Sequence, residues 1–318
     1  FYICGLPDTA VRESKDRVRA AIKNSGFNFP MRRITVNLAP ADIKKIGSHF
    51  DLPIAIGILT ASEQLPLSSL NEIYMLGELS LQGEIRRSSG VLSMALGLQK
   101  RMPGTTLVIS PENSAEAALA KEISITAPNT LAELAQSLQT GRSLKLIESD
   151  QGQVLHLLNC CPASGDMSEV KGQENAKRAL EIAAAGNHNI IMVGPPGSGK
   201  TMLARRLQGI LPPLCLEEAI EVTRIFSVAG LLQTDIPVVS SRPFRAPHHS
   251  ASTASIIGGG HHPKPGEISL ATHGILFFDE FPEFHRDVLE ALRQPLEDRI
   301  VTVARAAQTF TFPANFLF

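Results

Sequence analysis

The chain of 318 residues is long enough to form two domains with separate hydrophobic cores. Its hydrophobic content of 43% and charged content of 19% are ordinary for a globular protein, and no apolar run approaches the roughly 20 residues that a membrane-spanning helix needs. The formal net charge of −1 excludes a protein that coats nucleic acid with a uniformly basic surface, so any such contact must be local.

The two ends of the sequence indicate a fragment of a cytoplasmic protein. The chain starts at Phe1 without a signal peptide and stops at Phe318 in the middle of a pattern, so we expect sequence to be missing at both ends. The cysteines have neither metal-ligand spacing nor an even framework, which favours reduced thiols; they are Cys4, Cys160, Cys161 and Cys215.

Residues 1–140 are predicted to alternate helices and strands in an α+β domain. Apolar periodicity indicates helices over 12–24, 52–62, 91–101 and 114–122. Thr130 and Glu133 have the spacing of a capping box that opens a last helix. Strands are expected over 33–38, 106–110 and 123–126, and the runs 74–79 and 83–87 predict a hairpin. No phosphate loop, metal cluster or nucleophile elbow is found in this half.

Three segments of this half, at 77–86, 90–92 and 107–113, resemble the Lon-protease-type domain of the ribosomal S5-like fold. Peptidases of that family use a Ser–Lys dyad. The place of the serine falls near Asp51, and the place of the lysine falls within 92–95, where no lysine occurs. Ser48 lies nearby without an evident activating base. The resemblance therefore implies a non-proteolytic domain with a structural or recruiting role.

Residues 141–165 are predicted to be an inter-domain linker, because periodicity is lost and Gly, Ser, Pro and Asp accumulate. Cys160 and Cys161 are neighbours, which is a poor arrangement for a metal or redox site, so we interpret them as part of the linker. The second domain is expected over 166–318, with a first helix over 176–184.

A phosphate-binding loop dominates the second domain. The apolar run 189–193 predicts a strand, a helix is expected from 202, and the glycine loop between them has the G-x-x-x-x-G-K-[ST] pattern in its required setting. Lys200 would reach the β- and γ-phosphates, and Thr201 would place its hydroxyl on Mg²⁺. The alternative is an ordinary glycine-rich turn. The predicted nucleotide contacts are Gly194, Pro195, Pro196, Gly197, Ser198, Gly199, Lys200 and Thr201.

A second buried strand, predicted over 274–278, ends in Asp279 and Glu280. The aspartate could hold Mg²⁺, and the glutamate could polarise the attacking water as the catalytic carboxylate. Such a pair is a weak signal alone, but together with the glycine loop it predicts hydrolysis of a nucleoside triphosphate.

The segment 241–266 is locally basic, since no Asp or Glu occurs between Asp235 and Glu267. Its cations Arg242, Arg245 and Lys264 are candidates for contacts with a DNA backbone. Two alternatives stay open. One is a merely solvated loop, and the other is a zinc site made by its histidine pairs, namely His248, His249, His261 and His262.

Two β runs, 299–304 and 309–312, predict a hairpin with Arg305 near its tip. The alternative is an ordinary pair of strands that completes the sheet. Arg305 is the fourth candidate for a DNA contact.

The motifs 166–200, 242–250, 258–260, 263–271 and 279–284, with 5–18 and 33–40 in the first half, resemble the ComM/YifB proteins, which are related to the magnesium-chelatase ATPase subunit. The resemblance implies an α/β architecture in which an S5-like (Lon-like) α+β domain precedes an AAA+ P-loop domain. It also implies ATP and Mg²⁺ as cofactors, and adenine contacts at Val170 and Gly172. The hairpin would then point into the pore of a ring.

The function that this resemblance implies is a hexameric ATPase motor that moves DNA, of the kind that promotes branch migration when DNA is integrated in natural transformation. Two rival functions remain. One is a chelatase-type motor that remodels a protein partner, and the other is an ATP-dependent Lon-like protease.

Overall fold

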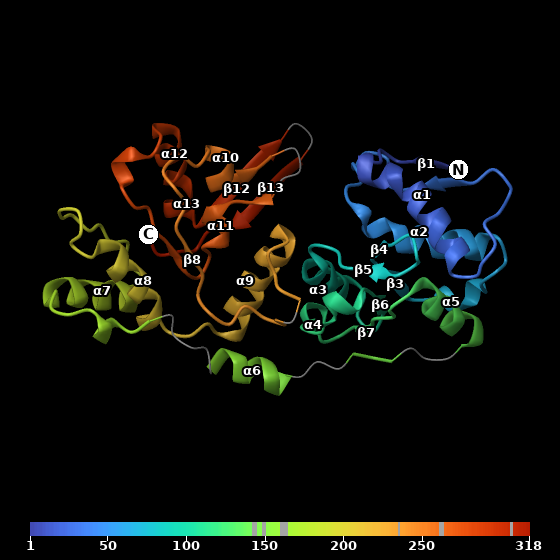
Figure 1. Cartoon of the computed structure of the whole chain (residues 1–318), viewed down its shortest axis with the longest axis horizontal. Helices are drawn as coiled ribbons and strands as arrows, with labels where there is room; N and C mark the ends of the chain where they lie inside the picture. The colour runs from blue at the N-terminus through green and yellow to red at the C-terminus, as the bar shows by residue number, and fades with distance from the viewer. Residues whose placement is uncertain (142–144, 148–150, 160–164, 235, 261–263, 306–307) are drawn as a thin grey trace. The chain divides into compact units, whose positions relative to one another are not determined.

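The computed structural model describes residues 1–141, 145–147, 151–159, 165–234, 236–260, 264–305 and 308–318 (Figure 1). The chain forms two compact units. The first comprises Phe1–Asp150 with Gln233–Pro237, and the second comprises Gln151–Leu232 with Val238–Phe318. None of the described helices has both the length and the apolar character needed to cross a membrane.

Short strands form the sheets of the first unit. Strand β1 (Tyr2–Cys4) pairs in parallel with β2 (Thr35–Asn37). A three-stranded parallel sheet has the order β3 (Ile73–Met75), β6 (Thr106–Val108), β7 (Ser124–Thr126). The expected hairpin is confirmed for β4 (Glu78–Leu79) and β5 (Ile85–Arg86). The start of the predicted run 74–79 instead belongs to β3, because Tyr74 and Met75 pair with β6.

Five α-helices accompany these strands: α1 (Thr9–Asn24), α2 (Asp51–Ala61), α3 (Val91–Arg101), α4 (Ser114–Ala117) and α5 (Leu131–Thr140). The carboxylate of Asp8 accepts a hydrogen bond from Val11 N at 2.8 Å and so fixes the start of α1. The Thr130 hydroxyl caps α5 by accepting from Glu133 N. The side chain of Glu133 reaches Asn129 N rather than Thr130 N, so the capping box closes one residue earlier than expected. Helix α4 ends at Ala117, short of the predicted 122.

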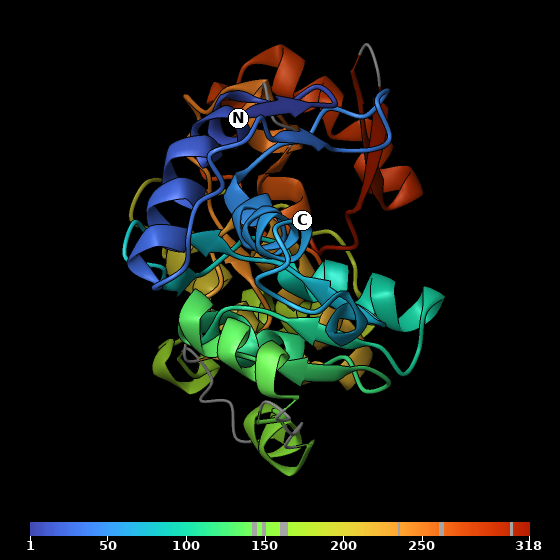
Figure 2. The same cartoon turned by 90° about the vertical axis from the view of Figure 1, so that its right-hand side faces the viewer.

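The main core of the first unit forms where α1 and α2 pack together. Val18, Ala21 and Ile22 of α1 are buried against Leu52, Ile56 and Leu59 of α2. Helix α2 is apolar around most of its circumference, which is typical of a helix enclosed by its neighbours. Figure 2 shows this part from the side, with α1 and the nearby strands in blue. The 3₁₀ turns of this unit are η1 (Ser48–Phe50), η2 (Leu67–Leu70) and η3 (Pro111–Asn113).

The second unit contains both helices that the sequence predicted, which are α7 and α8, together with several that it did not predict. Its helices are α6 (Gln151–Asn159), α7 (Glu174–Gly186), α8 (Lys200–Ile210), α9 (Leu216–Ala229), α10 (Thr253–Ile257), α11 (Glu267–Leu270), α12 (Arg286–Ala291) and α13 (Arg293–Asp298), with 3₁₀ turns η4 (Met167–Glu169) and η5 (Phe281–Glu283). Helix α6 falls inside the segment predicted to be an irregular linker. Cys160 and Cys161 lie outside the described residues.

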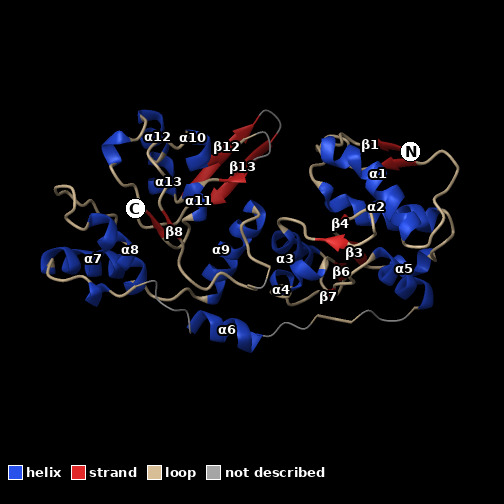
Figure 3. Ribbon diagram, viewed as in Figure 1, coloured by secondary structure: helices blue, strands red, loops and turns tan. Residues whose placement is uncertain are grey.

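Parallel and antiparallel pairs both occur among the described strands of the second unit, which are red in Figure 3. Strand β8 (Phe244–Arg245) pairs with β11 (Ile275–Leu276), and Ile275 also bridges to Leu317. Gly274 is required at the start of β11, because a Cβ atom there would overlap the backbone of Pro243. Antiparallel pairs join β9 (Gly258–Gly259) to β10 (Lys264–Pro265), and β12 (Ile300–Arg305) to β13 (Gln308–Pro313). The last pair is the hairpin predicted from the sequence.

The run 189–193, predicted to be a strand, is not a strand of any sheet in the described structure. Its Ile190 N donates to Phe318 O at 2.9 Å, so the run begins beside the segment that bridges to β11. Ile191 and Val193 are 76% and 92% exposed. The glycine loop still lies between this run and a helix, as predicted. The backbone pairing that would make 189–193 a central strand, however, extends no further than Ile190.

Candidate functional site

The glycine loop connects 189–193 to α8 and turns through two left-handed residues. Gly197 has φ 76° and Gly199 has φ 88°, a region that costs glycine little and other residues more. Gly199 is the N-cap of α8, which begins at Lys200. The free N–H groups and the positive end of the helix dipole therefore lie at this turn, where an anion would be stabilised.

The polar groups of the loop fit a phosphate. The Lys200 ammonium donates to the carbonyl oxygens of Gly194 and Pro195, each at 3.0 Å, which places its charge over the loop. The Ser198 hydroxyl is buried and has no hydrogen-bond partner among the described residues. An ideal Cβ on Gly194 would lie 3.1 Å from that hydroxyl, so only glycine leaves it unhindered.

Thr201 and Asp279 are brought together, although 78 residues separate them in the sequence. The Thr201 hydroxyl donates to Asp279 Oδ2 at 2.8 Å, and the other carboxylate oxygen accepts from Glu280 N at 3.1 Å. A hydroxyl beside a carboxylate is the kind of hard oxygen pair that Mg²⁺ prefers. The two residues predicted as metal ligands thus fit the ion.

Glu280 stands in the left-handed region, with φ 53° and ψ 48°. Its side chain is 70% exposed, and its Oε2 lies 3.9 Å from Nδ1 of His249. The carboxylate predicted to polarise water is therefore open to solvent, and it directly follows Asp279 in the segment after β11. His249 is a neighbour that the sequence did not indicate, because 31 residues separate the two.

The two residues expected to contact adenine, Val170 and Gly172, lie in different surroundings. Val170 is 2% exposed and packs in a core cluster with Leu180, Leu203 and Ile275. Gly172 has φ 66°, and the next residue, Gln173, reaches back so that its side-chain amide donates to Ser198 O at 3.4 Å. The structure thus joins this segment to the phosphate loop, and the adenine contacts of Val170 and Gly172 stay a prediction.

Arg242 is held by groups of its own unit. Its guanidinium donates to the carbonyl oxygens of Pro212, Pro213 and His273, and to Glu218 Oε2 at 3.1 Å. Its side chain is only 15% exposed. An arginine enclosed in this way joins α9 to the start of β11, which is a structural role rather than that of a cation free to meet DNA.

Arg245 forms a bidentate ion pair with Glu267, with Nε and Nη2 at 2.6 and 2.8 Å from the two carboxylate oxygens. Hydrogen bonding to Glu267 raises the pKa of Arg245 further above its ordinary value. The sequence placed Glu267 at the boundary of the basic segment and did not reveal this pairing. Arg242 and Arg245 are therefore not free cations, contrary to the sequence interpretation.

The other two candidates for DNA contacts, Lys264 and Arg305, lie on the strands β10 and β12. Lys264 is exposed on β10. Arg305 is the last residue of β12 and pairs in register with Gln308. The zinc alternative is only partly visible, since His261 and His262 lie outside the described residues. Within the ranges that the structure describes, no three His, Cys, Asp or Glu side chains group as metal ligands.

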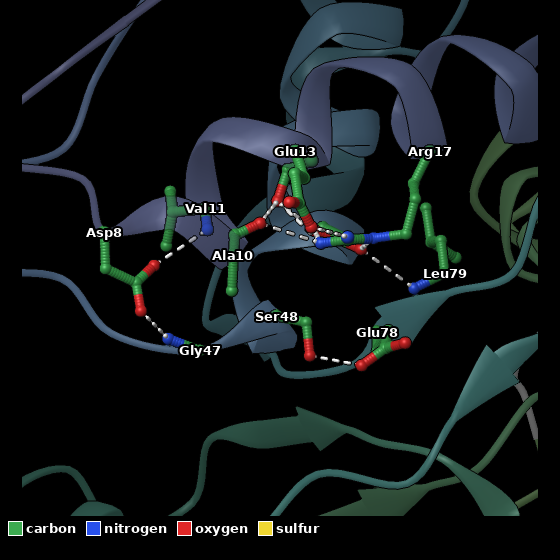
Figure 4. A network of polar contacts seen from close by, with 11 residues as sticks. Asp8, Ala10, Val11, Glu13, Arg17, Gly47, Ser48, Glu78 and Leu79 are labelled. Carbon is green, nitrogen blue, oxygen red and sulfur yellow. Dashed lines mark hydrogen bonds and ion pairs between the residues drawn. The ribbon is translucent and has the colours of Figure 1, made fainter. Parts of the chain in front are cut away.

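Polar contacts fill the region near Asp51, where the resemblance to Lon proteases led us to expect the nucleophile (Figure 4). Asp51 is fully buried and accepts from Arg17 Nε at 2.7 Å, from Arg17 Nη2 at 3.1 Å, from Leu79 N at 3.3 Å and from the Ser14 hydroxyl. The Ser48 hydroxyl donates to the Glu78 carboxylate. Neither arrangement activates a serine, because the side-chain partner of Ser48 among the described residues is a carboxylate rather than a lysine amine.

Family models match segments in both halves of the chain. A model described as magnesium chelatase, subunit ChlI, matches residues 166–318, and a model described as subunit ChlI of Mg-chelatase matches residues 1–113. Competence protein ComM of Haemophilus influenzae is 47% identical over 322 residues, a match that covers 99% of this chain and 61% of ComM. The protein YifB of Escherichia coli is 44% identical over 312 residues, covering 98% of this chain and 60% of YifB. The chain belongs to the ComM/YifB family.

As a ComM/YifB protein, the chain combines mixed α/β structure with a P-loop NTPase unit of the magnesium-chelatase-like AAA+ type. The chain spans about three fifths of the length of ComM and YifB. A more distant similarity connects this ComM/YifB chain to Lon protease 2 of Bacillus subtilis, which is 31% identical over 152 residues, covering 42% of this chain and 25% of that protease.

Proposed function

We propose that this protein is an ATP-hydrolysing AAA+ motor that acts on DNA as a homo-hexameric ring in the cytoplasm. The observation that carries the ATPase part is the hydrogen bond between Thr201 and Asp279, since it joins the end of the phosphate loop to the acidic segment that follows β11. The resulting site offers an anion nest, a cation and a pair of hard oxygen ligands within one small region.

Each residue has a distinct role in the proposed reaction. The Lys200 ammonium leaves the loop carbonyls and binds the β- and γ-phosphates, because phosphates carry a full negative charge and carbonyl oxygens only a partial one. Thr201 and Asp279 would hold Mg²⁺, and the ion when bound would neutralise phosphate charge. Glu280 accepts a hydrogen bond from the attacking water and orients it toward the γ-phosphate.

Three observations support DNA as the substrate that the motor moves. The hairpin of β12 and β13 extends six residues on each side and ends at Arg305, and Lys264 is exposed on a second short hairpin. The relative ComM bears the name competence protein. Within the proposal, these two cations contact DNA phosphates while the ring promotes branch migration during integration of incoming DNA in natural transformation.

The nucleotide site is tested by two substitutions in the full-length protein. Lys200→Ala should abolish ATP binding, because the phosphate charge loses its ammonium partner. Glu280→Gln should keep ATP binding and stop turnover, because an amide is a poor acceptor for the attacking water. Equilibrium binding of a fluorescent ATP analogue measures nucleotide binding, and phosphate release measures turnover, so the two assays together distinguish the two variants. Wild-type turnover by Glu280→Gln would remove this residue from the mechanism.

The DNA part is tested by combining Arg305→Ala with Lys264→Ala. Binding to a fluorescent forked duplex should weaken, and its salt slope should fall by about two units, because each cation neutralises one phosphate. Basal ATP hydrolysis should persist, since neither residue lies in the phosphate loop or on β11. A matched control is Lys171→Ala with Arg286→Ala, two exposed cations of the same unit. Equal affinity and slope in the test and control variants would contradict these DNA contacts.

The same experiment addresses the rival motor. A chelatase-type ATPase that remodels a protein partner predicts no stimulation of ATP turnover by DNA in any variant. The matches to magnesium-chelatase subunit models favour this rival over the remaining one. The protease function needs a dyad, whereas Ser48 is bonded to Glu78 and Asp51 is enclosed by Arg17. Casein degradation that disappears in Ser48→Ala would overturn this conclusion.

A further inference from the structure

Helix α1 carries a line of cations along one face. Arg12, Lys15, Arg19 and Lys23 follow one another at spacings of three or four residues, which places them on the same side of a helix. The line is about 16 Å long at 1.5 Å per residue. Arg12, Arg19 and Lys23 are exposed, and Lys15 is half-buried. None of the four makes an ion pair or side-chain hydrogen bond with another described residue.

Two aromatic rings accompany these cations. The Lys15 ammonium lies 5.9 Å and the Arg33 guanidinium 5.2 Å from the ring centre of Tyr2, which is 56% exposed. The Arg19 guanidinium lies 5.5 Å from the ring centre of Phe29. Such contacts hold cationic heads next to aromatic faces near the surface. We call Tyr2, Arg12, Lys15, Arg19, Phe29 and Arg33 the α1 patch.

The charge of this region is exceptional for the chain. Residues 9–33 contain seven Lys or Arg and two Asp or Glu, whereas the whole protein has a formal net charge of −1. Of the two acids, Glu13 lies 4.0 Å from Arg17, and Asp16 is exposed. Positive charge is therefore concentrated in this segment, whereas the rest of the chain carries a net negative charge.

The buried polar contact of α1 lies away from this face. The helix is fixed by its opposite side, where Arg17 meets the buried Asp51. Lys15 and Arg19 each differ from Arg17 by two positions, and so point about 160° away from it at 100° per residue. Unpaired like charges at these spacings are mildly destabilising in an isolated helix, so a binding role gives them a physical reason.

We propose that the α1 patch binds the backbone and bases of single-stranded DNA, which gives the first unit a DNA contact of its own. The cations would track successive phosphates, and the exposed ring of Tyr2 would stack on an unpaired base as Lys15 and Arg33 turn to the phosphates. Phe29 is partly buried against the core and would hold Arg19 at the surface. A duplex keeps its bases stacked internally and would engage only the cations. This inference rests on the proposed DNA motor and adds a second site to it.

The test uses the full-length protein and fluorescein-labelled oligothymidylate over a series of salt concentrations. Lys15→Gln, Arg19→Gln and Arg33→Gln combined should weaken binding about tenfold or more. The salt slope should fall by about two, since each phosphate contact on a single strand contributes about 0.7. Tyr2→Leu should weaken binding about tenfold, because the stacking surface is removed, and should leave the slope unchanged. Basal ATP hydrolysis and the thermal unfolding temperature should not change.

The matched control is Lys100→Gln, Arg101→Gln and Lys121→Gln, which removes the same charge from exposed positions of the same unit. Equal weakening in the test and control triple variants would overturn the proposal. So would unchanged oligothymidylate binding together with abolished binding to vesicles that contain phosphatidylserine, which would make the patch a lipid-binding surface.

Failure of this inference can be told from failure of the proposed function. DNA-stimulated ATP turnover that depends on Arg305 and Lys264 but not on the α1 patch would contradict the inference alone. Absence of DNA binding and of DNA stimulation in the unsubstituted protein would contradict both.

Discussion

Replacing Arg17 by methionine should destabilise the first unit more than any nearby change of a surface charge. Asp51 has no solvent exposure, and the guanidinium supplies two of its hydrogen bonds, at 2.7 and 3.1 Å. Without Arg17 the carboxylate is left as a buried charge with only the Ser14 hydroxyl and Leu79 N as partners. Breaking such a pair costs about 3–5 kcal/mol. For a unit of this size that corresponds to a fall in unfolding temperature of about 10 °C.

Differential scanning calorimetry of the chain measures this destabilisation, and a double-mutant cycle tests its cause. Arg17→Met combined with Asp51→Leu should recover most of the stability, because no uncompensated charge remains. Glu13→Gln is the control, since Glu13 is 67% exposed and lies 4.0 Å from the same guanidinium. A shift below about 2 °C in Arg17→Met, or no recovery in the double variant, would refute the reasoning.

The remaining predictions concern the metal pair, one structural ion pair and one histidine. Asp279→Asn should raise the Mg²⁺ concentration needed for half-maximal ATP turnover at least tenfold, because a charged oxygen ligand is removed, whereas Thr201→Ser keeps the hydroxyl and should change it little. Arg245→Met should lower the unfolding temperature of the second unit by several degrees, because Glu267 loses a bidentate partner; an unchanged temperature would show the pair to be dispensable. Burial lowers the pKa of His49 below its ordinary value of 6.5, so the unfolded chain binds the proton more readily. Stability should therefore be complete above pH 6.5 and decline as the pH falls below it, and His49→Gln should flatten that decline in urea titrations.

Local signals in the sequence predicted most helices of the first unit because their causes are local. Helix α3 has the predicted limits, and the N-cap at Thr130 is in place. Helix α6 was missed, because Gln151 and Gly152 open a segment of weak periodicity within a stretch that collects Gly, Ser, Pro and Asp. The sequence pattern does not reveal the tertiary contacts that stabilise such a helix.

Long-range pairings explain the other differences. The sequence identified Thr201 and Asp279 separately, through a loop pattern and a strand pattern, and the topology then joined them. The partners of Arg242 and Arg245 have no such pattern, because Glu218 and Glu267 lie 24 and 22 residues away. The run without acids was interpreted as a basic loop, although Glu267 directly follows it and Glu218 reaches it from α9.

Glu280 illustrates a conflict between stability and activity that is built into the site. Its backbone is left-handed, a conformation that disfavours residues with a Cβ by about 1 kcal/mol or more. Glycine at this position would relax the turn into η5 and would be expected to stabilise the folded unit, while removing the carboxylate assigned to the water. Selection for stability alone would thus favour loss of Glu280. A library screened only for heat resistance should be enriched in glycine or asparagine at position 280, and one screened for ATP turnover should retain glutamate.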